Sequence, residues 1–390
     1  MTSELNLPKI NKYVLRKQRL TGEKADKSIV ETVRAIGGLH ATNATTPYLS
    51  LFARCENFRR EQLDAELYVK RNLGKIRYVR TTVHVLPKDM IPTAFAATKM
   101  ITEPASRAYS RFLGITEKQY AETSRQIMEI LKGKKGMTTK QIKQKLQTAL
   151  NVSPIVNLMC DQGLLIRGAP EKGWKSNMHT YHLLNEYFPD LEWNAISEKD
   201  AEKAVVRQYL ASFAPVTEND VSWWTGFLKG QVKQIIEELH DEVSYVPVSG
   251  IDKTFIMPSQ EKAALMATKA TGKHVVNMLP NMDPYMMGYK DRERYLDSAR
   301  YNYAFDPAGN ATTTILLDGK VIGVWDFEEP FIKIFLFDQA KADVLKEIQV
   351  KARSVGAFIS GKEVKVKECT SMIPLTQRTA GGFISPLKGS

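Results

Sequence analysis

The sequence has little cysteine. Its three cysteines, Cys55, Cys160 and Cys369, lie far apart in a chain of 390 residues. An odd number of widely spaced cysteines argues against a disulfide framework and suits a reducing compartment, so we expect a cytoplasmic protein. The sequence also lacks any apolar run of about 18 residues, and its polar N-terminus has no apolar signal-peptide core. We therefore expect no membrane span.

Motifs of several enzyme classes are missing too. The sequence has no Cys-x-x-Cys, no His-Glu-x-x-His, no Gly-x-Ser-x-Gly and no phosphate-binding P-loop, because the Gly-Lys-Lys-Gly at 133–136 lacks the required spacing. No His or carboxylate cluster has the spacing of a metal site. We expect no metal and no cofactor, which leaves a cofactor-free reaction or simple binding.

Acidic residues are outnumbered. The chain has 55 Lys and Arg against 43 Asp and Glu, a net charge of +12. An excess of this size favours a polyanionic partner, although a soluble enzyme can also simply be basic. Charge alone leaves both interpretations open; together with the repeats and the resemblance described below, it leads us to expect double-stranded DNA as the partner and a monomer as the functional unit.

One supersecondary pattern recurs along the first two thirds of the chain. It is clearest at 116–192, where the sequence predicts helices at 117–131, 138–146 and 153–163 and strands at 164–167 and 179–183. Three helices and a hairpin are the order of a winged helix. The pattern returns at 193–258 and, less clearly, at 1–115, where helices are expected near 9–19, 27–37 and 46–56. A repeated unit predicts an array of similar domains.

From about residue 259 the pattern changes to strands. Asp318-Gly319 is a strong hairpin-turn signal between apolar runs, 331–336 has the pattern of another strand, and 339–355 that of an amphipathic helix. The predicted fold class is therefore α+β, with three tandem winged-helix units followed by a small barrel-like β domain at 259–390.

A basic stripe crosses the helix-turn-helix part of the 116–192 unit. Its functional interpretation is contact with DNA phosphates, which supplies affinity without sequence specificity, and the alternative is an ordinary solvated surface. Its members are Lys132, Lys134, Lys135, Lys140, Lys143 and Lys145.

Four segments carry a resemblance to a known family. Taken in order they resemble the AlkZ/YcaQ-like family of bacterial DNA glycosylases over most of the chain, with one departure. That family usually has Gln–apolar–Gln or Gln–apolar–Asp where this sequence has His40-Ala41-Thr42. The segments are 37–42 with 47–49, 79–86, 278–285 and 315–325.

The resemblance implies a fold of three winged helices and a β-barrel, and hydrolysis of the N-glycosidic bond of an alkylated purine. An N7-alkyl purine is cationic and leaves as a neutral base, so the site must stabilise a sugar cation and orient a water. We expect the triplet to end a helix and open a loop. His40 would be the water-activating base and Thr42 its orienting partner. The alternative is that His40 only caps a helix C-terminus.

The other matching segments supply further candidates. His84 and Arg80 would line the same cleft and contact DNA, the alternative being a His satisfied within a sheet. Asp283 could stabilise the sugar cation, the alternative being an Asx-type turn. Trp223 and Trp224 we interpret as core residues.

These observations predict a monofunctional DNA glycosylase. The main alternative is a DNA-binding protein, a regulator or damage binder, that has lost the glutamine-based motif. A third hypothesis is that the winged helices mediate protein contacts, which strongly salt-dependent DNA binding would argue against.

Overall fold

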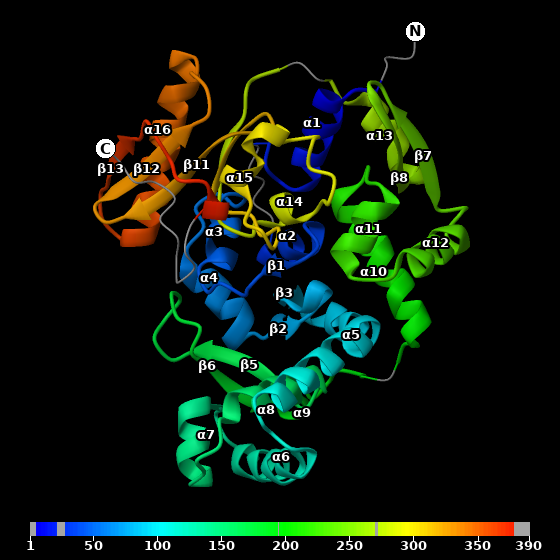
Figure 1. Cartoon of the computed structure of the whole chain (residues 1–390), viewed down its shortest axis with the longest axis vertical. Helices are drawn as coiled ribbons and strands as arrows, with labels where there is room; N and C mark the ends of the chain where they lie inside the picture. Colours follow the sequence, from blue (N-terminus) through cyan, green and yellow to red (C-terminus); the bar gives the residue numbers. More distant parts are fainter. Residues whose placement is uncertain (1–4, 22–27, 194, 270–271, 378–390) are drawn as a thin grey trace.

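The computed structural model describes residues 5–21, 28–193, 195–269 and 272–377. Helices and strands are intermixed along the whole chain (Figure 1), so the α+β class is confirmed. Along the long axis, α6 and α7 lie at one end and α1 and α16 toward the other, with β1, α2 and α3 between them (Figure 1).

The first of the three units, 1–115, contains more helix than expected. A 22-residue helix, α5, follows the β2–β3 hairpin and packs against α8 and α10. Its interior Pro104 normally breaks a helix, which is why the sequence did not reveal it. The expected helix at 27–37 is shorter, and Lys27 lies outside the described residues. The elements are α1 (Leu7–Lys17), α2 (Ile29–Ala35), β1 (Leu39–His40), α3 (Thr46–Phe52), α4 (Arg60–Asp64), β2 (Leu73–Arg77), β3 (Val83–Pro87) and α5 (Ile91–Phe112).

Residues 116–192 form the three helices and the hairpin expected from the sequence, and two further short elements that the sequence did not predict. Thr138 caps α7. Its hydroxyl accepts a hydrogen bond from the Gln141 amide, and the Gln141 side-chain oxygen accepts one from the Thr138 amide, which makes a capping box. The elements are α6 (Glu117–Leu131), β4 (Met137–Thr138), α7 (Thr139–Leu146), α8 (Val152–Asp161), β5 (Leu165–Pro170), β6 (His179–Leu183) and α9 (Leu184–Tyr187).

The hairpins of these two segments join in one sheet. Its order is β1-β3-β2-β5-β6-β4, and the junction is the antiparallel pair Lys75 and Arg167 on β2 and β5. The sheet therefore fixes β1 relative to the helices of the second segment.

The third segment shares a core with its neighbours. Side chains from α1, α5 and α10 to α12 and from residues 279–321 belong to one buried cluster. Trp224 is buried in it against Tyr209 and Phe213, as the core interpretation of Trp224 predicts. The elements are α10 (Glu198–Phe213), α11 (Glu218–Thr225), α12 (Lys229–Glu238), β7 (Val243–Val248), β8 (Ile251–Pro258) and α13 (Lys262–Ala267).

The last segment corrects the expectation of a closed barrel. Its five strands run in the open order β13-β12-β11-β10-β9, and α16 packs against β9, β12 and β13 instead of a returning strand. The expected Asp318-Gly319 turn joins β10 and β11. The elements are β9 (Val276–Leu279), α14 (Pro284–Met287), α15 (Tyr301–Ala304), β10 (Thr314–Leu317), β11 (Lys320–Glu328), β12 (Phe331–Leu336), α16 (Ala342–Ser360) and β13 (Lys365–Glu368).

Candidate active site

The triplet begins in a short strand, not at a helix end. α2 stops at Ala35, and Gly37 and Gly38 follow with φ of 76° and 98°. A Cβ on Gly38 would lie 2.6 Å from Leu86 Cδ2, so only glycine lets the chain turn here and pair with β3. The expectation that the triplet ends a helix is therefore wrong, and so is the alternative that His40 is a helix C-cap.

The β1–β3 ladder carries a pair of histidines, with Thr42 following closely in the chain. Leu39 and Ala41 point into a hydrophobic core, so His40 and Thr42 lie on the opposite face, since side chains alternate along a strand. His40 pairs with His84 across the ladder, and their ring centroids lie 4.3 Å apart. The exposed Thr42 accepts a 3.3 Å hydrogen bond at its hydroxyl from the Val83 amide. The structure thus brings together His40, Thr42 and His84.

Both imidazoles are buried. His84 is engaged with the Thr82 carbonyl at 3.2 Å, whereas His40 Nδ1 is buried with no hydrogen-bond partner among the described residues. Burial is the main cause that holds the pKa of His40 well below 6.5, with smaller contributions from His84 and Arg80. Burial likewise lowers the pKa of His84 to about 4. Both rings are therefore neutral at pH 7, and His40 keeps an unpaired nitrogen.

These shifts predict acid sensitivity. The unfolded chain protonates each histidine near pH 6.5, whereas the folded chain excludes the proton from His84 down to about pH 4. The unfolded state thus binds more protons in this window, and the free energy of unfolding falls as pH drops from 6.5 toward 4. We expect thermal unfolding scans to show this decline. His84→Gln should flatten it, and an unchanged slope would contradict the assignment.

Arg80 lies close enough to both histidines to lower the pKa of each. It has a positive φ of 52°, and its half-buried guanidinium stacks on the Trp223 ring at 3.9 Å. Burial and, to a smaller extent, Arg292 lower the pKa of Arg80 to about 10, against the opposing effect of Asp306. It remains a cation at neutral pH, and Trp223, packed against the core, fixes its position.

The Asp283 carboxylate is held by structural hydrogen bonds. It is fully buried, its two oxygens accept from the Arg54 guanidinium at 2.7 Å each, and Ser50 donates a further bond at 2.9 Å. It also accepts from the Tyr285 amide at 3.0 Å as the cap of α14, so the Asx-type alternative is confirmed. The carboxylate thus ties the start of α14 to α3.

Two hollows open beside the loop that follows the triplet. They have volumes of about 390 and 400 Å³ and share four lining residues, so they adjoin. None of the expected site residues lines them, but Asn177, which does, donates to the Thr42 carbonyl at 3.3 Å. The hollows thus begin one residue beyond the triplet. The shared residues are Asn43, Asn281, Thr313 and Asp326.

Asp326 is a site residue that the sequence did not reveal. Its carboxylate, 4% exposed, lies on β11 at both hollows. The signal was present, because an acidic residue inside the apolar strand Val-Trp-Asp-Phe is costly to bury without a purpose. Asp306 also lines one hollow, and its two oxygens accept from Asn310.

The six lysines of the basic stripe are all exposed, on α7 and the turn before it. They lie toward the opposite end of the molecule from α16, with β1 between (Figure 1). In the described ranges, no group of three or more His, Cys, Asp or Glu side chains could hold a metal ion, and no helix is long and apolar enough to span a bilayer.

Comparisons with known proteins identify the family and the fold. The model of the family "DNA glycosylase AlkZ-like" matches residues 33–330. The interstrand DNA cross-link repair glycosylase of Streptomyces sahachiroi is 22% identical over 350 residues, covering 85% of this chain and 91% of that protein. The solved structure of the S. sahachiroi DNA glycosylase AlkZ superposes with a TM-score of 0.77 at 18% identity, covering 94% of this chain and 100% of that one. The resemblance carried by the four segments is thereby confirmed: the chain belongs to the AlkZ-like family of DNA glycosylases.

Proposed function

We propose that the protein hydrolyses the N-glycosidic bond of alkylated or adducted purines of the N7-alkylguanine type in double-stranded DNA, without a lyase step. The observation that carries this proposal is that two adjoining hollows begin at Asn43, one residue after the triplet whose His40 pairs with His84 on the β1–β3 ladder. The Asp326 carboxylate lines both hollows, and His40 and Thr42 directly precede Asn43, the first residue of the chain that lines them.

The chemistry needs little acid catalysis. The C1′–N9 bond breaks with its electron pair going to the cationic base, which leaves neutral, and an oxocarbenium-like sugar remains. Water attacks C1′, and its proton passes to His40. Because the pKa of His40 is lowered, the ring is unprotonated at pH 7 and can accept that proton, and a weak base suffices against so strong an electrophile. Thr42 orients the water.

Asp326 supplies the negative charge that the His-Ala-Thr triplet lacks. A carboxylate held at the hollows stabilises positive charge on the sugar as it develops, and burial strengthens that interaction. Asp283 enters the proposal as a positioning residue, since its carboxylate holds the loop that bears Asn281 against α3.

We further infer that 1–115, 116–192 and 193–258 are winged-helix units that hold the duplex, followed by the β domain at 259–390. The order of helices and hairpins in each segment supports this. The basic stripe and Arg80 would contact phosphates. His84 is buried, and it would hold the His40 ring in position by packing against it.

A second candidate substrate is an interstrand cross-link, the lesion in the name of the S. sahachiroi relative. The observation that favours it is that the two hollows adjoin, which leaves room for a bulky adduct beyond the excised base.

Asp326→Asn tests the site directly. The amide keeps the shape of the side chain and removes its charge, so we expect base release from a duplex carrying N7-methylguanine to slow by on the order of 10²-fold. Single-turnover assays at saturating protein measure it. Asp306→Asn is the matched control, because that carboxylate lines one hollow but binds Asn310 through both oxygens. Equal rates for the two variants would overturn the role of Asp326.

A further inference from the structure

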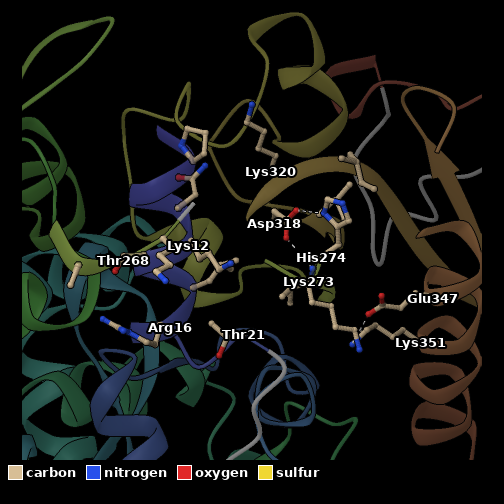
Figure 2. A pocket seen from close by; sticks show the side chains of 18 residues that line it. Lys12, Arg16, Thr21, Thr268, Lys273, His274, Asp318, Lys320, Glu347 and Lys351 are labelled. Atoms are coloured by element: carbon tan, nitrogen blue, oxygen red, sulfur yellow. Dashed lines mark hydrogen bonds and ion pairs between the residues drawn. The ribbon is translucent and has the colours of Figure 1, made fainter. Parts of the chain in front are cut away.

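A third cavity lies apart from the candidate active site. It has a volume of about 970 Å³ and is bounded by α1, the connection before β9, the β10–β11 turn and α16 (Figure 2). None of its lining residues lines either hollow beside the triplet. It is larger than both of those hollows together, and the proposed chemistry does not use it.

The lining is strongly basic. Six Lys and Arg side chains face two carboxylates, an excess of four positive charges. Figure 2 shows Lys12 and Arg16 on α1, Lys320 beyond the turn and Lys351 on α16 around the same opening. The cationic residues are Lys12, Arg16, Lys269, Lys273, Lys320 and Lys351.

The carboxylates do not neutralise this lining. Asp318 is engaged by His274 Nδ1 at 2.6 Å and by the Val275 amide at 2.9 Å. Glu347 lies 3.8 Å from Lys351, its neighbour on α16. Arg16, Lys273 and Lys320 have no ion pair with any described carboxylate, so their charge is available to an external anion.

The chemistry of the lining favours phosphate over nucleobase. No Phe, Tyr or Trp is among the described residues that line the cavity, so it offers no platform on which a base could stack. Flexible lysines from separate elements suit a chain of phosphates, whose contacts fix position without reading sequence.

We propose that this cavity binds the phosphate backbone of duplex DNA. It would be a second contact, on the other side of the active site from the basic stripe. The placement supports it, because β1 lies between α7 and the pair α1 and α16 along the long axis (Figure 1). The inference rests on the proposed function for its partner, the DNA duplex, but not on base release.

The test is the salt dependence of duplex binding by a Lys273→Gln/Lys320→Gln double variant. Both side chains are exposed, so the fold should tolerate the change, and an unchanged melting temperature verifies that. Each lost phosphate contact lowers the slope of log K against log salt by about 0.9, so two lost contacts predict a decrease of about 1.8. Lys262→Gln/Lys365→Gln, two exposed lysines outside the cavity and outside the three winged-helix units, is the matched control and should keep the wild-type slope.

Inorganic tripolyphosphate separates the two sources of phosphate. If the cavity variant loses tripolyphosphate binding while its duplex slope equals that of wild type, the cavity takes a free polyphosphate and the proposal is overturned. An equal fall in slope for the control pair also overturns the proposal, because the effect would then come from the loss of any two lysines and not from the cavity.

The outcomes also separate this inference from the proposed function. A reduced slope in a protein that releases no base supports the cavity contact and defeats the glycosylase proposal. Normal base release with an unchanged slope supports the glycosylase proposal and defeats the cavity contact.

Discussion

His40→Ala should slow base release by on the order of 10²-fold or more while leaving duplex affinity nearly unchanged. The rate falls because general-base catalysis contributes on the order of 10²-fold to 10⁴-fold. The affinity holds because His40 is neutral at pH 7 and only 5% exposed, so it forms no ion pair with a phosphate. Single-turnover base release and duplex binding, measured on the same preparations, give both quantities.

His40→Gln is the matched comparison. It places at this position the carboxamide that the AlkZ/YcaQ-like family usually carries, which can hold a water although it is a poorer base. We expect its rate to lie between those of wild type and His40→Ala. If His40→Ala releases base as fast as wild type, His40 is not the base, and the water must be activated elsewhere.

Asp283→Asn should destabilise the protein by about 3–5 kcal/mol, because it leaves the buried charge of Arg54 without its partner. Both side chains of the pair are fully buried, and the two hydrogen bonds between them are 2.7 Å long. The same change frees the start of α14 from α3 and so disturbs the hollow that Asn281 lines. The midpoint of urea unfolding measures the loss.

Asp318→Asn is the control for that prediction. Its partner is His274, and both side chains are about half exposed, so the pair contributes little to stability. We expect its urea midpoint to stay close to that of wild type. Equal midpoints for Asp283→Asn and Asp318→Asn would contradict the role assigned to the buried pair.

The sequence predicted local structure best where caps and turns mark it. The helix expected at 138–146, which Thr138 caps, and the Asp318-Gly319 turn both stand where the residue types placed them. Each depends on contacts within a few residues, which a sequence displays directly.

Features set by distant contacts could not be predicted in this way. α5 continues through Pro104 because it packs against α8 and α10, and the last sheet stays open because α16 covers it. Both outcomes depend on partners far along the chain.

The candidate site shows the same division. The triplet and His84 were found because they lie in recognisable segments, and the structure joins them across one ladder. The ion pair of Asp283 could not be predicted from the sequence, since its partner Arg54 lies 229 positions away. Asp326 was missed because its importance lies in the hollows that it shares with Asn43 and Asn281, not in its neighbours in sequence.

We expect this member of the family to be catalytic with His-Ala-Thr in place of the glutamine motif. The most direct measurement is base release by the wild-type protein from a duplex carrying N7-methylguanine, followed by alkaline cleavage. We expect free base and a strand that breaks only after alkali, which marks an intact abasic site. Intact adduct on this duplex and on one with a bulkier N7 adduct, with salt-sensitive binding retained, would contradict the claim.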